Sequence, residues 1–345
     1  MQTDEELDSF YERLVSYRNA DSLPTEEAFS VVVNDVISVL ESEDSSYRPS
    51  DDEEMPGGLL DFKDSDIPVI LVPDLHARPD FLLHLLKNGF GEDGETVLSA
   101  LAKGHVMIVC VGDGVHTEQM GDDFERWKES YGVWLEGTID SPSMRKEMQL
   151  GISTMLAVME LKIAFPRNFH FLKGNHENVL NMEGDGDHGF RKFALEGQMV
   201  REFIETVYSD AMLHLIHCFE LRLPIVALFK NFGVSHAEPA RVYSREQIIN
   251  YHDDDELILA FTWTGNGEAE EDSVSGIYKA LIDSEPDRVL WFGGHRPVPE
   301  RYLLRQDGHY VQFHNPYAMN VVVLCPGDDF DLEAGIVSVI EESSE

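Results

Sequence analysis

The sequence predicts an α/β sandwich with a mixed sheet, and two observations carry this prediction. From about residue 59 onward, short apolar runs alternate with helical patterns, and a series of strand-like runs follows later in the chain. The composition also allows a large packed core, because 43% of the 345 residues are apolar and 10% are aromatic. The chain is therefore long enough for one large domain or two small ones, and its composition is not that of a disordered segment.

Residues 1–41 are expected to form an N-terminal helical segment of two amphipathic helices. Apolar residues recur at helical spacing from Leu7 to Leu14 and from Phe29 to Leu40, with a start signal at Thr25. Residues 42–58 are rich in acidic residues, Ser, Pro and Gly, which predicts a flexible linker or an exposed loop.

The main domain is expected to span residues 59–327, and eight apolar runs within it are predicted to be strands. These runs are 67–72, 105–111, 169–174, 223–229, 232–236, 288–295, 310–314 and 320–325. A long helix precedes the third run, and its methionine-rich stripe is interpreted as core packing. The acidic tail, 328–345, could add an edge strand at Gly335 to Ile340.

The chain is strongly acidic, with 26 Lys and Arg against 65 Asp and Glu and a formal net charge of −39. Such a surface repels nucleic acids and anionic membranes, so neither is expected as a partner. The chain has no long apolar run and no signal-peptide pattern, which predicts a cytoplasmic protein. Its cysteines, Cys110, Cys218 and Cys325, are too far apart to suggest a zinc site or a disulfide framework.

Several of the predicted strands end in a Gly, a Pro or a short turn that carries a metal-ligand type of side chain. Ligands in open α/β sheets gather beyond the carboxyl ends of the strands. The candidate ligands are Asp74, His76, Asp113, Asn175, His236 and His295. This set of nitrogen and oxygen donors suits Mn²⁺, Fe or Zn²⁺. Because six ligands around a central carboxylate are too many for one cation, we expect two divalent or trivalent ions that share Asp113.

The motifs DLH, GDGV, GNHE, the SH before Ala237 and the late GH occur in this order. They resemble the signature of calcineurin-like metallophosphoesterases, and most closely that of the phosphoprotein phosphatase family, which runs GDxHG, GDxVDRG, GNHE, HGG and a final His. The resemblance covers roughly residues 60–325. It implies a four-layer α/β/β/α sandwich and makes residues 59–327 a catalytic domain.

The resemblance also implies roles for the site residues. The ligands would be Asp74 and His76 for the first ion, Asp113 for both ions, and Asn175, His236 and His295 for the second ion. His176 would protonate the leaving oxygen, and Glu177 would be a supporting carboxylate. The implied reaction is hydrolysis of a phosphomonoester by a hydroxide that bridges the two metals. Asp113 and His176 would then be the catalytic residues. Other histidines are not expected to be ligands, with His314 in the closing strand as the exception to watch.

The sequence departs from the family at positions that contact phosphate. His116 stands where the family has an Asp that orients the acid His, and Thr117 stands where it has an Arg. A second family Arg has no counterpart in residues 261–276, which hold no basic residue. Replacement cations could come from Arg78, Arg145 or Arg296. Residues 117–142 form an insertion whose aromatic side chains could line a cleft or pack a lid onto the body.

Two classes of function follow from these observations. The first is a metal-dependent Ser/Thr phosphatase-like hydrolase acting on a phosphorylated protein or small molecule, and nucleotide polyphosphates or small phosphoesters are alternative substrates. The second is a non-catalytic metal-binding protein of the same fold that recognises a partner. The presence of all six ligand types together with His176 favours the enzyme. The oligomeric state, the substrate and the metal pair are not predicted.

Overall fold

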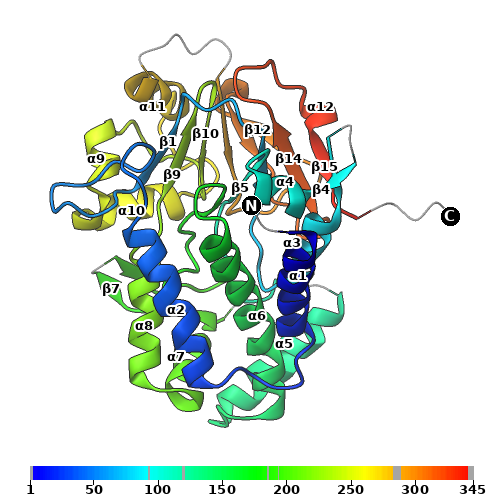
Figure 1. The fold of residues 1–345 in the computed structure, drawn as a ribbon. Helices are drawn as coiled ribbons and strands as arrows, with labels where there is room; N and C mark the ends of the chain where they lie inside the picture. The colour runs from blue at the N-terminus through cyan, green and yellow to red at the C-terminus, as the bar shows by residue number, and fades with distance from the viewer. Residues whose placement is uncertain are drawn as a thin grey trace.

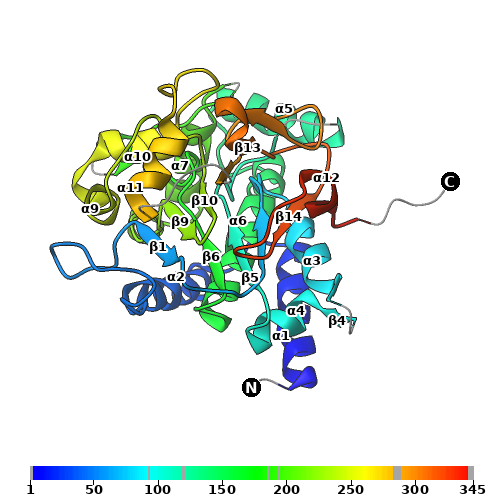
Figure 2. The same cartoon turned by 90° about the horizontal axis from the view of Figure 1, so that it is seen from above.

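The computed structural model describes residues 3–91, 94–118, 121–184, 186–192, 194–282 and 289–340. Two sheets lie face to face, and helices cover the outer side of each (Figures 1 and 2). The predicted four-layer α/β/β/α sandwich is therefore confirmed. Within the described residues, no helix combines the length and the apolar character needed to span a membrane.

The first sheet has five strands in the order β15-β14-β2-β5-β6. Their bounds are Ile336–Ser338, Asn320–Leu324, Val69–Val72, Met107–Cys110 and Phe169–Phe171. β2, β5 and β6 run parallel, whereas β14 is antiparallel to both β2 and β15. Every residue of β2 and β5 is buried, as expected of continuous apolar runs covered on both faces.

The second sheet has six strands in the order β1-β9-β10-β11-β13-β12. Their bounds are Leu59–Phe62, Val226–Phe229, Phe232–Ser235, Leu290–Gly293, Tyr310–Gln312 and Leu303–Arg305. β10, β11 and β13 are mutually parallel. The eight predicted strands and the edge strand β15 are confirmed, whereas β1, β12 and the four strands of two short hairpins were not predicted. Short hairpins pair β3 (Gly89–Phe90) with β4 (Glu95–Thr96) and β7 (Glu183–Gly184) with β8 (Asp187–His188).

Three apolar cores follow from this layering. Side chains such as Leu71, Val109 and Phe292 pack between the sheets. The outer face of the second sheet is covered by α9 (Arg245–Ile249), α10 (Asp255–Thr262) and α11 (Ser273–Ile282). The outer face of the first sheet is covered by α3 (Pro79–Lys87), α4 (Val97–Lys103), α6 (Pro142–Ala164), α7 (Glu196–Val207) and α8 (Asp210–Glu220). A short helix, α12 (Leu332–Gly335), precedes β15.

The predicted N-terminal helices are α1 (Asp4–Asn19) and α2 (Glu26–Glu41), and the side chains of Thr3 and Thr25 cap them. Both pack on α6, one on each side of it (Figure 1). Their apolar faces are buried in the same core as the five helices of that layer. The N-terminal segment is thus continuous with the body of the molecule.

Residues 42–58, expected to be a flexible linker or an exposed loop, form a loop in which Tyr47 and Arg48 are buried. The Arg48 guanidinium pairs with Glu43 at 2.5 Å and donates a hydrogen bond to the Gly57 carbonyl at 2.8 Å. Lys162 of α6 also donates to Glu43, at 2.5 Å. These buried charges attach the loop to the first helical layer.

The insertion forms a further helix, α5 (Gly121–Leu135), which packs on α6. Trp127 and Trp134 are buried, and the ring of Tyr131 stacks between theirs at centroid distances of 5.1 and 5.6 Å. Trp134 also donates a hydrogen bond to Glu202 of α7 at 2.7 Å. These aromatic residues therefore pack the insertion onto the body. The methionine-rich stripe of α6 lies in the core, as predicted.

Candidate metal centre

The six predicted ligands lie together beyond the carboxyl ends of strands from both sheets. Each follows a strand closely: Asp74 and His76 follow β2, Asp113 follows β5, Asn175 follows β6, His236 follows β10, and His295 follows β11. Each sheet contributes three parallel strands, so the loops after those strands share one edge. All six side chains are buried.

The donor atoms form two clusters that share Asp113. In the first, Nε2 of His76 lies 3.8 Å from Oδ2 of Asp74 and 3.6 Å from Oδ2 of Asp113. In the second, Oδ1 of Asn175 lies 2.9 Å from Nε2 of His236 and 2.9 Å from Nδ1 of His295. Nε2 of His236 is 3.6 Å from Oδ1 of Asp113, so the two oxygens of this carboxylate face different clusters.

The backbone at these loops adopts an uncommon conformation. The φ angles of His76, Asp113 and His295 are 42°, 53° and 63°, in the left-handed region that non-glycine residues rarely occupy. Hydrogen bonds hold the loops together. The His76 N–H donates to the Asp113 carbonyl at 2.6 Å, and the His295 N–H donates to the Asp74 carboxylate at 3.0 Å. The local strain is therefore offset by contacts between loops that carry ligands.

Glu177 stabilises the loops that carry the ligands. Its carboxylate accepts hydrogen bonds from the backbone N–H groups of Asp113, Gly114 and Gly174, each at 2.8 Å. Burial raises the pKa of Glu177, and the three backbone donors act in the opposite direction. The Glu of the GNHE motif thus fixes the loop that presents Asp113, which gives a physical basis for the supporting role predicted for it.

Two glycines leave room for the carboxylates. A Cβ atom on Gly294 would lie 1.8 Å from Oδ1 of Asp74, and one on Gly174 would lie 2.3 Å from Oδ1 of Asp113. Any side chain at either position would displace a predicted ligand.

The electrostatics suit a cation pair. Burial, followed by the nearby Lys192 and His176, holds the pKa of His76 well below its usual range, and burial and His236 do the same for His295. These imidazoles are therefore neutral, which is the form that binds metals. Burial and the nearby Asp74 raise the pKa of Asp113 well above its usual range, and added positive charge would relieve this repulsion. The buried nitrogen and oxygen donors and their convergence fit two metal ions.

His176 lies beside the first cluster, with Nε2 3.8 Å from Oδ2 of Asp113. Its ring stacks on Phe190 at a centroid distance of 4.5 Å. Within the described residues, neither ring nitrogen of His116 has a hydrogen-bond partner, and the two histidine rings are 5.7 Å apart. Stacking on Phe190, and not a hydrogen bond from residue 116, therefore orients the ring of His176.

Glu118 and Lys192 also reach the site, and the sequence did not predict them. Oε2 of Glu118 lies 2.9 Å from Nε2 of His314, and its Oε1 lies 3.7 Å from Nε2 of His76. The Lys192 ammonium donates to Glu118 and lies 3.4 Å from Nε2 of His76. Glu118 follows Thr117 directly, so the altered second motif was an available signal, whereas nothing in the sequence around Lys192 marks it.

The three arginines proposed to contact phosphate lie in three different environments. The Arg78 guanidinium donates to the carbonyls of Asp74 and Leu75, at 2.6 and 3.0 Å, and so braces the first loop. Arg145 forms an exposed ion pair with Asp140 at 2.5 Å. Arg296 is exposed directly after His295. Their contact with phosphate stays a prediction.

An apolar cavity of about 50 Å³ adjoins the site. His116 and His176 line one part of it, Met148, Met155 and Trp127 line another, and Phe29 of α2 contributes from the N-terminal segment. The second N-terminal helix, α2, thus lies close to the centre through this cavity.

A solved structure shares this fold over nearly the whole chain. A protein serine/threonine phosphatase from Saccharomyces cerevisiae, described as similar to human phosphatase PP5, superposes with a TM-score of 0.58 at 14% identity, covering 94% of this chain and 92% of that one. The four-layer fold implied by the motifs is thereby confirmed. No protein-family model matches the sequence, and a comparison with curated proteins finds no match.

Two more distant structures are cold-active protein tyrosine phosphatases. One has a TM-score of 0.42 at 15% identity, covering 76% of this chain and 75% of that one. The other, from a psychrophilic Shewanella, has a TM-score of 0.37 at 14% identity and covers 76% of each chain.

Proposed function

We propose that this protein is a phosphatase that depends on two metal ions and hydrolyses a phosphomonoester. The observation that carries the proposal is the position of Asp113, whose two oxygens face two separate clusters of donors 3.6 Å away. A carboxylate in this position can bridge two cations, and paired cations serve hydrolysis of phosphate esters. The fold shared with a Ser/Thr phosphatase supports the same conclusion.

Each predicted ligand has a place in this proposal. Asp74, His76 and Asp113 would hold the first ion, and Asp113, Asn175, His236 and His295 would hold the second. Mn, Fe and Zn all accept such donors. When bound, the ion pair supplies Lewis-acid charge for the phosphoryl oxygens and lowers the pKa of water.

Other residues of the chain would act on the substrate directly. His176 lies at the edge of the first cluster and would donate a proton to the leaving oxygen, with Phe190 fixing its ring. Lys192 places an ammonium among the donors and would contact a phosphoryl oxygen, in part replacing the missing arginines. Arg296 is a second candidate for this contact, whereas Arg78 and Arg145 are engaged with the Asp74 loop and with Asp140.

The substrate class is open between a Ser/Thr phosphoprotein and a small phosphoester. The yeast structure with this fold is a Ser/Thr phosphatase, which supports the first. His116 and Thr117, which differ from the family at positions that contact phosphate, favour the small phosphoester. Turnover compared over phosphopeptides, nucleotides and aryl phosphates would separate the two, because a protein phosphatase should favour the peptides.

The proposal is tested by hydrolysis of an aryl phosphate with added Mn²⁺, together with measured metal content. Asp113→Asn is expected to lose metal and activity together. His176→Asn should keep its metal while kcat falls by roughly 10²–10⁴-fold. His84→Asn, on the exposed side of α3, is the matched control and should behave as wild type. Activity that survives both site substitutions, or a wild-type protein that binds metal without turning over any phosphoester, would refute the proposal.

A further inference from the structure

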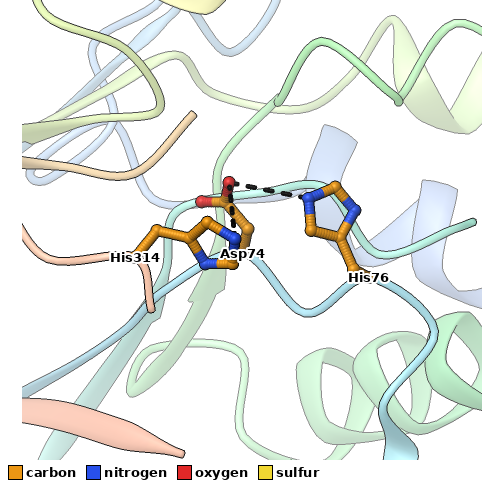
Figure 3. Close-up of side chains that lie close together, drawn as sticks. All are labelled: Asp74, His76 and His314. Carbon is orange, nitrogen blue, oxygen red and sulfur yellow. Dashed lines mark ion pairs between the residues drawn. The ribbon is translucent and has the colours of Figure 1, made fainter. Parts of the chain in front are cut away.

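His314 points into the centre although it is not one of the six predicted ligands. It follows β13 directly and is fully buried. Its Nε2 lies 3.9 Å from Oδ2 of Asp74, and Nε2 of His76 lies 3.8 Å from the same oxygen. Figure 3 shows a ring nitrogen of His76 and one of His314 each joined by an ion pair to the Asp74 carboxylate. Two imidazoles thus converge on one carboxylate oxygen.

Glu118 completes this convergence. One of its oxygens lies 2.9 Å from Nε2 of His314, and the other lies 3.7 Å from Nε2 of His76. The side chain is buried, with 6% of its surface exposed. Asp74, His76 and His314 form a buried group whose donor atoms all lie within 4.8 Å of one another, close enough to hold one ion. Glu118 adds a carboxylate directly beside the two imidazoles of this group.

We propose that His314 and Glu118 are further ligands of the first ion, in addition to Asp74, His76 and Asp113. The inference rests on the proposed function, because it extends one of the two metal sites. It gives the first site three carboxylates and two imidazoles, whereas the second has one carboxylate, one amide oxygen and two imidazoles. The first site therefore carries more negative charge and binds its cation more tightly.

The position of Lys192 also supports a cation site at these residues. Its ammonium donates to Glu118 and lies 3.4 Å from Nε2 of His76, so these donors already attract a positive charge. Lys192 and a metal ion would compete for Glu118. A purely structural ion-pair network would behave differently, because loss of Lys192 would then weaken it as much as loss of Glu118.

The test is a titration of the metal-free protein with Mn²⁺. Binding is measured by calorimetry and by electron paramagnetic resonance of the bound ion. Wild type should show a tight and a weak site. His314→Asn and Glu118→Gln should each weaken Mn²⁺ binding at the tight site by at least roughly tenfold and leave the weak site unchanged. Mutation of residues that only hydrogen-bond to a metal ligand already lowers metal affinity by about 10–100-fold. Lys192→Met should leave the tight site as strong or stronger, and His84→Asn is the control.

The outcomes separate this inference from the proposed function. If wild type binds two ions and both His314→Asn and Glu118→Gln bind them with unchanged affinity, the added ligands are wrong and the phosphatase proposal stands. If wild type binds no pair of ions, the proposed function itself fails. Should His314→Asn not fold, as judged by circular dichroism, the nearly isosteric Glu118→Gln decides the question alone. Weakening of the tight site by Lys192→Met as large as that by Glu118→Gln would also overturn the inference.

Discussion

Glu177→Gln is expected to destabilise the protein and to weaken metal binding without removing any ligand. The wild-type carboxylate accepts three buried backbone N–H groups, two on Oε2 and one on Oε1. A glutamine has only one acceptor oxygen, so its amide nitrogen must face at least one of these N–H groups. With the oxygen in the Oε2 position, the N–H of Gly114 loses its partner.

The magnitude follows from these contacts. A buried donor without a partner costs about 1–3 kcal/mol, and the remaining two hydrogen bonds weaken because the acceptor is no longer charged. Burial raises the pKa of Glu177, so removing its charge recovers part of that loss. A net loss of about 2 kcal/mol is expected, well above the change of about 0.5 kcal/mol typical of a surface substitution. Because Asp113 moves with its loop, metal affinity should also fall about 10–100-fold.

Urea unfolding of the metal-free protein measures the first effect, and a Mn²⁺ titration measures the second. Glu12→Gln, an exposed change of the same kind on α1, is the control and should leave both unchanged. An unfolding free energy for Glu177→Gln within about 0.5 kcal/mol of wild type would refute the claim that this carboxylate holds the Asp113 loop.

Three further changes probe other parts of the structure. Gly294→Ala would place a Cβ atom 1.8 Å from Oδ1 of Asp74, so Mn²⁺ affinity should fall by roughly tenfold or more, whereas Gly132→Ala, with open space around it, should leave titrations unchanged. Gly151→Ala lies inside α6, where the new Cβ meets only ordinary contacts at 3.6–3.8 Å. It should raise stability by about 0.5–1 kcal/mol, and a lower melting temperature would contradict this. Burial alone would raise the pKa of Glu43, but Lys162 and Arg48 lower it to about 2 from 4.5. Its stabilising contribution, up to about 3 kcal/mol, is therefore present above pH 4.5 and lost as the pH falls toward 2. Urea unfolding should show a smaller loss over this range in Glu43→Gln than in wild type, and equal losses would contradict the assignment.

The strands and the strand-end side chains could be predicted because their signals are local. Runs such as 67–72 and 105–111 are apolar enough to be buried on both faces, and Asp74 and Asp113 follow them immediately. Parallel pairing then brings the ends of the strands to one edge. β1 was not predicted because Asp61 interrupts its short apolar run. β12 was not predicted because it is a three-residue edge strand whose two leucines are partly exposed.

Loop conformation, and not a periodic pattern, brings Glu118 and Lys192 to the site. The altered second motif was the one signal for Glu118, and the sequence offered none for Lys192. Glu118 follows a turn in which His116 has a φ of 76°. Lys192 is set by a hydrogen bond from its own N–H to the buried Glu196 at 2.9 Å. The packing of α1 and α2 on α6 likewise depends on tertiary contacts, which sequence spacing does not contain.

The changes at residues 116–118 can be understood together. Where the family pattern has Asp-Arg-Gly, this chain has His-Thr-Glu, so the segment changes from a net charge of zero to −1 with His neutral. The side chain of Thr117 accepts a hydrogen bond from Arg126 at 3.2 Å, and Glu118 faces His76 and His314. The segment thus has no Lys or Arg and directs a carboxylate at the proposed first ion. Under the proposed function, charge for binding phosphate would come chiefly from the ions and from Lys192. Lys192→Met should then raise KM more than it lowers kcat, while tight-site metal affinity is kept.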